Sequence, residues 1–127
     1  MDREILFKGC TVLGNRWIKG IYIPFTDKQF GYIIDRVTGE QILCYNKSIG
    51  QYTGLTDKNG KKIFEGDIVH GYWNTKFLIF FDLCCLQFRA KLSDGTEKDI
   101  DYYGDSKKIE VIGNIYDNPE LLRSENG

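Results

Sequence analysis

The stretch GQYTGLTDKNGKKIFEGDIV, residues 50–69, decides the fold of this chain. Within it, Asp57–Lys58–Asn59–Gly60 predicts a tight hairpin turn, because Asn and Gly tolerate the positive φ that such a turn needs. Glu65–Gly66–Asp67 comes just before the apolar pair Ile68–Val69. A glycine followed by Asp at that place is typical of a sharp bend that leads into a strand. The residues interpreted as structural are therefore Asn59, Gly60, Gly66 and Asp67.

Other parts of the sequence agree with this stretch in the same chain order: REILFKG (Arg3 to Gly9), Trp17, and VIGNIYDNPELL (Val111 to Leu122). Together with residues 50–69, they make the chain resemble the YopX family of small phage and prophage proteins. The resemblance covers both ends and the middle, so most of the chain. It implies a largely β fold and a phage or prophage origin. Because the biochemical role of that family is not established, the resemblance assigns no catalytic residue.

The composition is that of an ordered, nearly neutral globular chain. There are 17 basic and 18 acidic residues, giving a formal net charge of −1, which argues against a protein that grips nucleic acid through bulk positive charge. No apolar run is long enough to span a bilayer, and the N-terminal residues lack the apolar core of a signal peptide. The sequence therefore predicts a protein of the bacterial host cytoplasm that makes no membrane contact.

The pattern of apolar residues predicts an all-β fold. Residues 86–92 alternate between apolar and polar side chains, and Asp94–Gly95 is a hairpin signal that points to a partner strand over residues 97–103. The apolar run 77–83 predicts a central strand buried on both faces, and further strands are expected over residues 17–25, 30–34, 41–46 and 109–116. Asn118–Pro119 predicts one closing helical turn with Asn118 as its N-cap.

This number of strands favours a small antiparallel barrel or sandwich. The chain is expected to form a single YopX-like domain over residues 1–127. Within that domain we distinguish an N-terminal β subdomain, 1–54, from a C-terminal one, 55–127. The C-terminal subdomain is predicted to be an SH3-like barrel.

Catalysis and metal binding are not expected. His70 is the one histidine in the sequence and has no nucleophile motif beside it. Cys84 and Cys85 are adjacent, whereas zinc sites space their ligands as C-x₂₋₄-C, and neighbours on a strand point to opposite faces. Cys10 and Cys44 are interpreted as small apolar side chains that fill space in the core. We therefore predict no enzyme activity, no cofactor and no bound metal.

One region suggests a binding surface. Lysines gather at the predicted turn, and aromatic residues follow it in sequence, a combination that can contact phosphates and stack bases. Aromatic residues are also what small barrels use for their cores, so a core role for them stays open. The candidate partner or nucleic-acid surface consists of Lys58, Lys61, Lys62, Tyr72 and Trp73.

Three functional hypotheses follow from these patterns. The first is a non-enzymatic phage accessory protein that binds an unknown macromolecular partner. The second is a sequence-tolerant binder of single-stranded nucleic acid, and the third and last is a metal-dependent enzyme. The apolar segment Phe77–Phe81 must be covered by the sheet or by another subunit, so we also expect a homo-oligomer, a dimer or higher.

Overall fold

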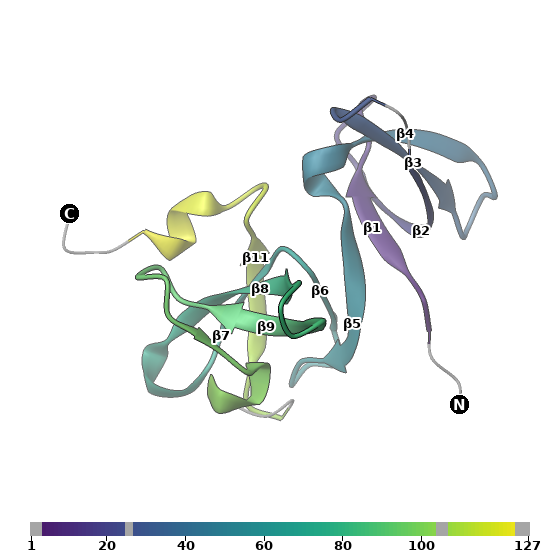
Figure 1. Cartoon of the computed structure of the whole chain (residues 1–127). Helices are drawn as coiled ribbons and strands as arrows, with labels where there is room; N and C mark the ends of the chain where they lie inside the picture. The colour runs from purple at the N-terminus through teal and green to yellow at the C-terminus, as the bar shows by residue number, and fades with distance from the viewer. Residues whose placement is uncertain (1–3, 25–26, 104–106, 124–127) are drawn as a thin grey trace. The chain divides into compact units, whose positions relative to one another are not determined.

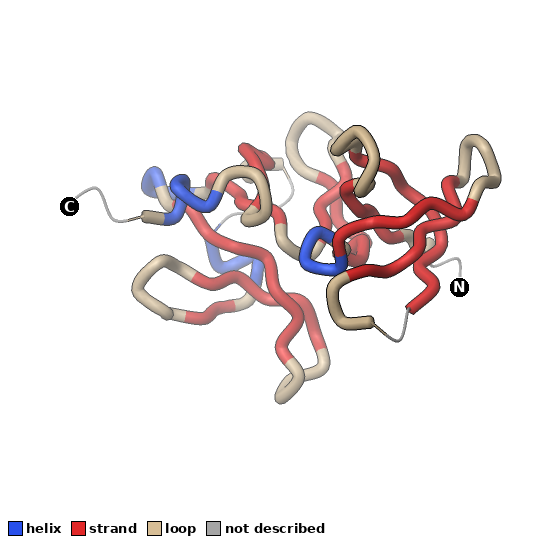
Figure 2. The backbone as a smooth tube through the Cα atoms, turned by 90° about the horizontal axis from the view of Figure 1, so that it is seen from above, coloured by secondary structure: helices blue, strands red, loops and turns tan. Residues whose placement is uncertain are grey.

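The computed structural model describes residues 4–24, 27–103 and 107–123 (Figure 1). Strands dominate the backbone and the helices are single short turns, as the red and blue segments of Figure 2 show. The chain divides into two compact units, residues 1–52 and 53–127. The prediction of an all-β antiparallel fold is confirmed. The SH3-like assignment and the existence of independent subdomains stay predictions.

The N-terminal unit is built from β1 (Phe7–Cys10), β2 (Trp17–Pro24), β3 (Phe30–Asp35), β4 (Gln41–Tyr45), the 3₁₀ turn η1 (Asn46–Ser48) and the start of β5 (Gly50–Thr56). All its pairings are antiparallel, in the order β4–β3–β2–β1–β5. Every second residue of the strands points into the core, which centres on Ile18, Ile33 and Cys44.

The N-terminal sheet is so strongly curled that the residues just after β1 contact β4. Thr11, which is fully buried, forms a bridge with Cys44, and the amide of Val12 donates to the carbonyl of Leu43 at 3.0 Å. The curl needs a glycine in β2, since a Cβ on Gly20 would overlap the carbonyl of Ile34. The free edge of β4 is therefore partly covered next to Cys44.

The C-terminal unit contains the end of β5, then β6 (Lys62–Phe64), β7 (Asp67–His70), η2 (Tyr72–Asn74), β8 (Lys76–Asp82), β9 (Gln87–Lys91), β10 (Glu97–Lys98), η3 (Ile100–Tyr103), β11 (Glu110–Asn114) and η4 (Pro119–Leu122). Its five-stranded sheet has the order β10–β9–β8–β7–β11. Strand β8 lies between two neighbours, and its Phe77 and Ile79 are fully buried. The prediction of a central strand is confirmed, but only one face of the strand is fully buried, and Leu83 lies exposed in the turn that follows.

The predicted strands of this unit differ from the observed ones at their ends, most clearly in two places. The strand expected over residues 97–103 ends at Lys98, because the chain turns into η3 and places Ile100 in the core beside Ile79 and Ala90. Leu86, expected to begin the strand before it, lies in the β8–β9 turn with φ of 54° and is 73% exposed. In both places the requirements of the turn and of the core override the period-two pattern.

The bend at Gly66 joins β6 to β7. Gly66 has φ of +92°, its amide donates to the carbonyl of Ile79, and its carbonyl accepts from the amide of Ile115. The side chain of Asp67 is buried and accepts a hydrogen bond from the amide of Phe64 at 2.8 Å. The two residues therefore fix the chain between neighbouring segments at the start of β7.

Candidate binding surfaces

The predicted turn at residues 57–60 is held by the carboxylate of Asp57. It accepts hydrogen bonds from the amides of Asn59 and Lys61, both at 2.9 Å, and from the amide of Val111 in β11 at 3.0 Å. Asp57 is only 4% exposed, so this carboxylate joins the turn to the far end of the chain from inside the unit. Gly60 supplies the positive φ of the turn, 79°.

The lysines of this turn differ in their surroundings. The ammonium of Lys58 lies 3.5 Å from the carboxylate of Glu110, which also accepts from the side-chain amide of Asn59 at 3.3 Å. Lys61 is exposed and Lys62, at the start of β6, is half-buried. Lys58 is thus tied to β11 by an exposed ion pair, whose contribution to stability is small.

The aromatic pair forms the tip of the β7–β8 hairpin. Trp73 is 79% exposed and Tyr72 is 37% exposed, with ring centroids 5.6 Å apart. Trp73 and Asn74 both have positive φ, 58° and 56°, in a loop closed by the amide of Gly71 donating to the carbonyl of Thr75 at 2.8 Å. The ring Nε2 of His70 lies 2.8 Å from the side-chain oxygen of Asn74. The hairpin therefore displays Trp73 on an ordered turn.

The lysines and the aromatic pair lie on different hairpins of the C-terminal unit. Glu110, the partner of Lys58, stands opposite His70 in the β11–β7 pairing, and His70 is hydrogen-bonded to the aromatic tip. The structure therefore brings Lys58 and Trp73 to the same end of the sheet, with β11 and β7 between them. It gives no contact between the aromatic rings and Lys58 or Lys61 among the described residues.

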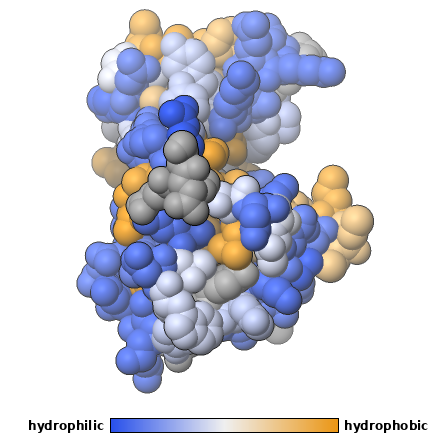
Figure 3. All heavy atoms as spheres, turned by 90° about the vertical axis from the view of Figure 1, so that its left-hand side faces the viewer, coloured by the Kyte–Doolittle hydropathy of each residue, from blue (hydrophilic) through white to orange (hydrophobic). Residues whose placement is uncertain are grey.

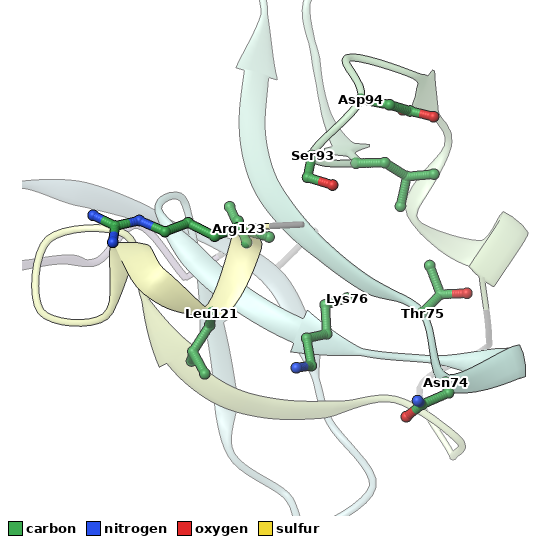
Figure 4. Close-up of a pocket in the computed structure, with 9 residues that line it drawn as sticks. Asn74, Thr75, Lys76, Ser93, Asp94, Leu121 and Arg123 are labelled. Carbon is green, nitrogen blue, oxygen red and sulfur yellow. The ribbon is translucent and has the colours of Figure 1, made fainter. Parts of the chain in front are cut away.

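A groove in the C-terminal unit was not predicted. It consists of two adjoining hollows of about 320 and 300 Å³ between η4 and the β8–β9 strands, and both hollows are lined by Leu92, Ser93, Leu122 and Arg123. In Figure 4, Lys76, Ser93 and Asp94 come from the sheet and its turn, whereas Leu121 comes from η4 and Arg123 follows it. The face of the molecule drawn in Figure 3 shows small groups of hydrophobic residues, in orange, among hydrophilic ones, in blue.

Asn118 stands at the predicted N-cap position of the closing turn η4, but its side chain is used differently from the prediction. Asn118 makes no side-chain cap to η4; its side-chain oxygen accepts from the amide of Asn114, and its own amide donates to the Asn114 carbonyl. A Cβ on Gly113 would lie 2.6 Å from that oxygen and 2.9 Å from Leu121. The glycine in β11 therefore allows the closing turn to lie directly against the strand.

A second unpredicted surface is the outer side of the N-terminal sheet. Its residues pair across the strands, as Ile21 with Ile34 and Tyr32 with Leu43, and none belongs to the N-terminal core. Phe30 and Tyr45 add a tilted aromatic contact at 6.1 Å. We call this surface the apolar outer face; its partly or largely exposed residues are Ile21, Ile23, Phe30, Tyr32, Ile34, Leu43 and Tyr45.

Comparison with known proteins identifies the family. A family model described as "YopX protein" matches residues 22–123. The chain belongs to the YopX family. Among solved structures, this YopX-family chain is similar to the crystal structure of protein EF1440 from Enterococcus faecalis, with a TM-score of 0.58 and 24% identity over 96% of this chain and 100% of that one. At that identity the likeness concerns the fold alone. A comparison with curated proteins gave no match.

The His, Cys, Asp and Glu side chains among the described residues of the YopX-family chain are spread out. They include no group of three or more His, Cys, Asp or Glu side chains arranged to hold a metal ion. None of their helices is long and apolar enough to cross a membrane. His70 is engaged with Asn74 at the hairpin tip, which gives it a role in loop structure.

The four cysteines of the YopX-family chain fall into two classes. Cys10 and Cys44 are buried, with 2% and 0% exposure, and burial together with the neighbouring Cys10 thiol raises the pKa of Cys44 to about 11. Cys84 and Cys85 are exposed in the β8–β9 turn. Partial desolvation and the Asp82 carboxylate raise the pKa of Cys85 as well.

We expect iodoacetamide at neutral pH to label two cysteines in the native protein and four in denaturant, because only accessible thiolates react at an appreciable rate. Cys85 should be labelled slowly for an exposed cysteine, since its raised pKa leaves little thiolate at neutral pH. Intact-mass spectrometry counts the adducts, and peptide mapping locates them. Rapid native labelling of Cys10 or Cys44 would contradict this assignment.

Proposed function

We propose that this chain is a non-enzymatic β module of phage or prophage origin that binds macromolecular partners, beginning with a second copy of itself. The observation that carries the proposal is the apolar outer face. Soluble monomers rarely expose contiguous apolar patches larger than a few hundred Å², and such patches mark interaction sites. Here seven large apolar side chains from three neighbouring strands lie together on the outer side of the sheet, where Ile21 is 63% exposed and the other six are partly exposed.

A second copy suits this face on charge and geometry. None of its seven residues is charged, so two identical faces can meet without like-charge repulsion, and the formal net charge of the chain is only −1. Face-to-face stacking of sheets with interdigitating side chains is a standard packing mode. A dimer formed by pairing two β4 edges is less favoured than one formed by the outer faces, because Thr11 and Val12 already contact the edge of β4.

The expected dimer is weak. Only Ile21 of the seven residues is largely exposed, so two such faces are not expected to bury much more than the roughly 1,000 Å² at which specific contacts begin. We therefore expect dissociation in the micromolar range, so that light scattering across a dilution series shows a mass falling toward that of the 14.7 kDa monomer.

The variant Ile21→Lys tests which face is used. Ile21 is 63% exposed, so the lysine is tolerated in the monomer, but in a dimer its ammonium would be buried without a partner. We expect the dissociation constant to rise at least about tenfold, since an unpaired buried charge is expensive. The matched control is Val37→Lys in the β3–β4 turn, where the side chain is 87% exposed. A wild-type monomer at all concentrations, or equal effects of both variants, would reject the proposal.

Single-stranded nucleic acid is the second candidate partner. The observation that favours it is the presentation of Trp73, 79% exposed on an ordered turn, at the same end of the sheet as Lys58. Exposed aromatic rings stack bases, and nearby cations contact phosphates. Retention of the purified protein on a single-stranded DNA column that falls steeply with salt would support this candidate.

A further inference from the structure

The groove between η4 and the β8–β9 strands has a floor of leucines. Leu78 comes from β8, Leu92 follows β9, and Leu122 comes from η4. The backbone that places them is well fixed, because Asn118 ties η4 to β11 and the amide of Leu92 donates to the carbonyl of Thr96 at 2.9 Å. The floor therefore belongs to ordered elements of the C-terminal unit, and apolar side chains of a partner can be buried on it.

Basic side chains surround this floor. Lys76 begins β8, Lys91 ends β9, and Arg123 follows η4. Lys76 and Arg123 form no ion pair with the described residues, and Lys91 has its ammonium 5.8 Å from the Phe80 ring. The acidic lining residue Asp94 accepts from the amide of Thr96, and that hydrogen bond lowers its pKa. The groove thus offers three cations to a ligand against one carboxylate that is already hydrogen-bonded.

We propose that this groove binds an acidic peptide segment in which a leucine-like side chain neighbours a carboxylate. The apolar side chain would enter a hollow over Leu92 and Leu122, and carboxylates would pair with Lys76 and Arg123. Charge complementarity selects the sign of the ligand, while the leucine floor selects its apolar part. Single-stranded nucleic acid matches this groove less well, because its lining residues include no aromatic ring on which a base could stack.

The probes are three fluorescein-labelled octapeptides, (Glu-Leu)₄, (Glu-Ser)₄ and (Lys-Leu)₄, together with a labelled oligothymidine of twelve nucleotides. Fluorescence anisotropy measures affinity, and amide chemical-shift changes on the full chain locate the site. We expect (Glu-Leu)₄ to bind most tightly, with shifts confined to residues 74–78, 91–94 and 119–123. Equal binding of (Lys-Leu)₄, tighter binding of the oligonucleotide at these residues, or shifts elsewhere would overturn the proposal.

Charge-reversal variants distinguish peptide binding in the groove from a general response to the net charge of the protein. Arg123→Glu and Lys76→Glu should each weaken (Glu-Leu)₄ binding about fivefold or more, because each replaces an attraction at the rim by a repulsion. Lys47→Glu makes the same change in net charge at an exposed side chain of η1 in the N-terminal unit and should leave the affinity within twofold. An equal loss in all three variants would mean that the peptide responds to net charge alone, and the groove would be rejected as the site.

Discussion

The Asp57→Ala variant is expected to lose about 3–5 kcal/mol of its free energy of unfolding, since a nearly buried carboxylate with three backbone amide donors is removed. Two of those amides belong to the turn itself and the third belongs to Val111 in β11. Without the carboxylate they lack their acceptor in a place that water reaches poorly. Urea denaturation followed by intrinsic fluorescence measures the change.

Asp94→Ala is the matched control, because Asp94 is exposed and accepts from a single amide, that of Thr96. Its loss should cost no more than about 1 kcal/mol, the value of one ordinary hydrogen bond. Similar losses in the two variants would mean that the three-amide arrangement of Asp57 contributes nothing special.

The contribution of Asp57 should also depend on pH. Burial acts to raise the pKa of Asp57, but the amide hydrogen bonds from Val111, Lys61 and Asn59 and the charge of Lys61 outweigh it, and the pKa lies below its ordinary value of 3.8. Stability from a group with a lowered pKa is complete above the ordinary pKa and is lost as the pH falls through the folded-state value. The gap between wild type and Asp57→Ala should therefore be constant near neutrality and shrink below about pH 4.

Gly66→Val is expected to cost about 2–3 kcal/mol, because a β-branched residue is strained at positive φ. Gly66 has φ of +92°, and the nearest atom to an added Cβ is a methyl carbon of Ile115 at 3.9 Å. Lack of space is therefore not the cause of the expected loss; the backbone conformation is. Thermal unfolding of the two proteins measures it.

The informative control is Gly66→Asn. Asparagine fills similar space but tolerates the left-handed region, so it should cost less than half as much as valine. Equal costs would point to crowding around Ile115, and an unchanged melting temperature in Gly66→Val would show that the bend adapts to ordinary strand geometry.

Local signals were enough to predict most of the strands, but they missed β1 (Phe7–Cys10) and did not show where some of the others end. The turn at Asn59–Gly60 and the alternating strand around Ala90 are each determined by a few neighbouring residues, so the sequence alone predicts them. The resemblance of residues 50–69 to the YopX family is also visible from the sequence alone. The predicted strand over residues 97–103 failed because Ile100 is drawn into the core by Ile79 and Ala90, which are distant in sequence. Asn118 is a residue type that commonly caps helices, but its side-chain oxygen accepts a hydrogen bond from the amide of Asn114 and does not cap η4.

Both new surfaces depend on strand order, which no local pattern contains. The apolar outer face arises because Ile21, Ile34, Tyr32 and Leu43 become neighbours through the β2–β3–β4 register. The sequence FGYIID of β3 gives a partial hint of the apolar outer face, because residues on both faces of that strand are apolar. The groove needs η4 to lie over β8, and that requires β11 to pair with β7. Among the residues predicted to form a site, Tyr72 and Trp73 lie together, while the lysines lie on a separate hairpin.

The pairing of β11 with β7 has a consequence for the order of folding. Strands β7, β8 and β9 follow one another and can form hairpins through short loops, whereas Asp57 and Val111 are 54 residues apart. As the chain leaves the ribosome, the hairpins can therefore assemble before residues 110–114 have emerged from the exit tunnel. During that interval β7 has an open edge and Asp57 lacks one of its donors. Loss of the Asp57 carboxylate should accordingly speed unfolding more than it slows folding, because its contact with β11 forms late.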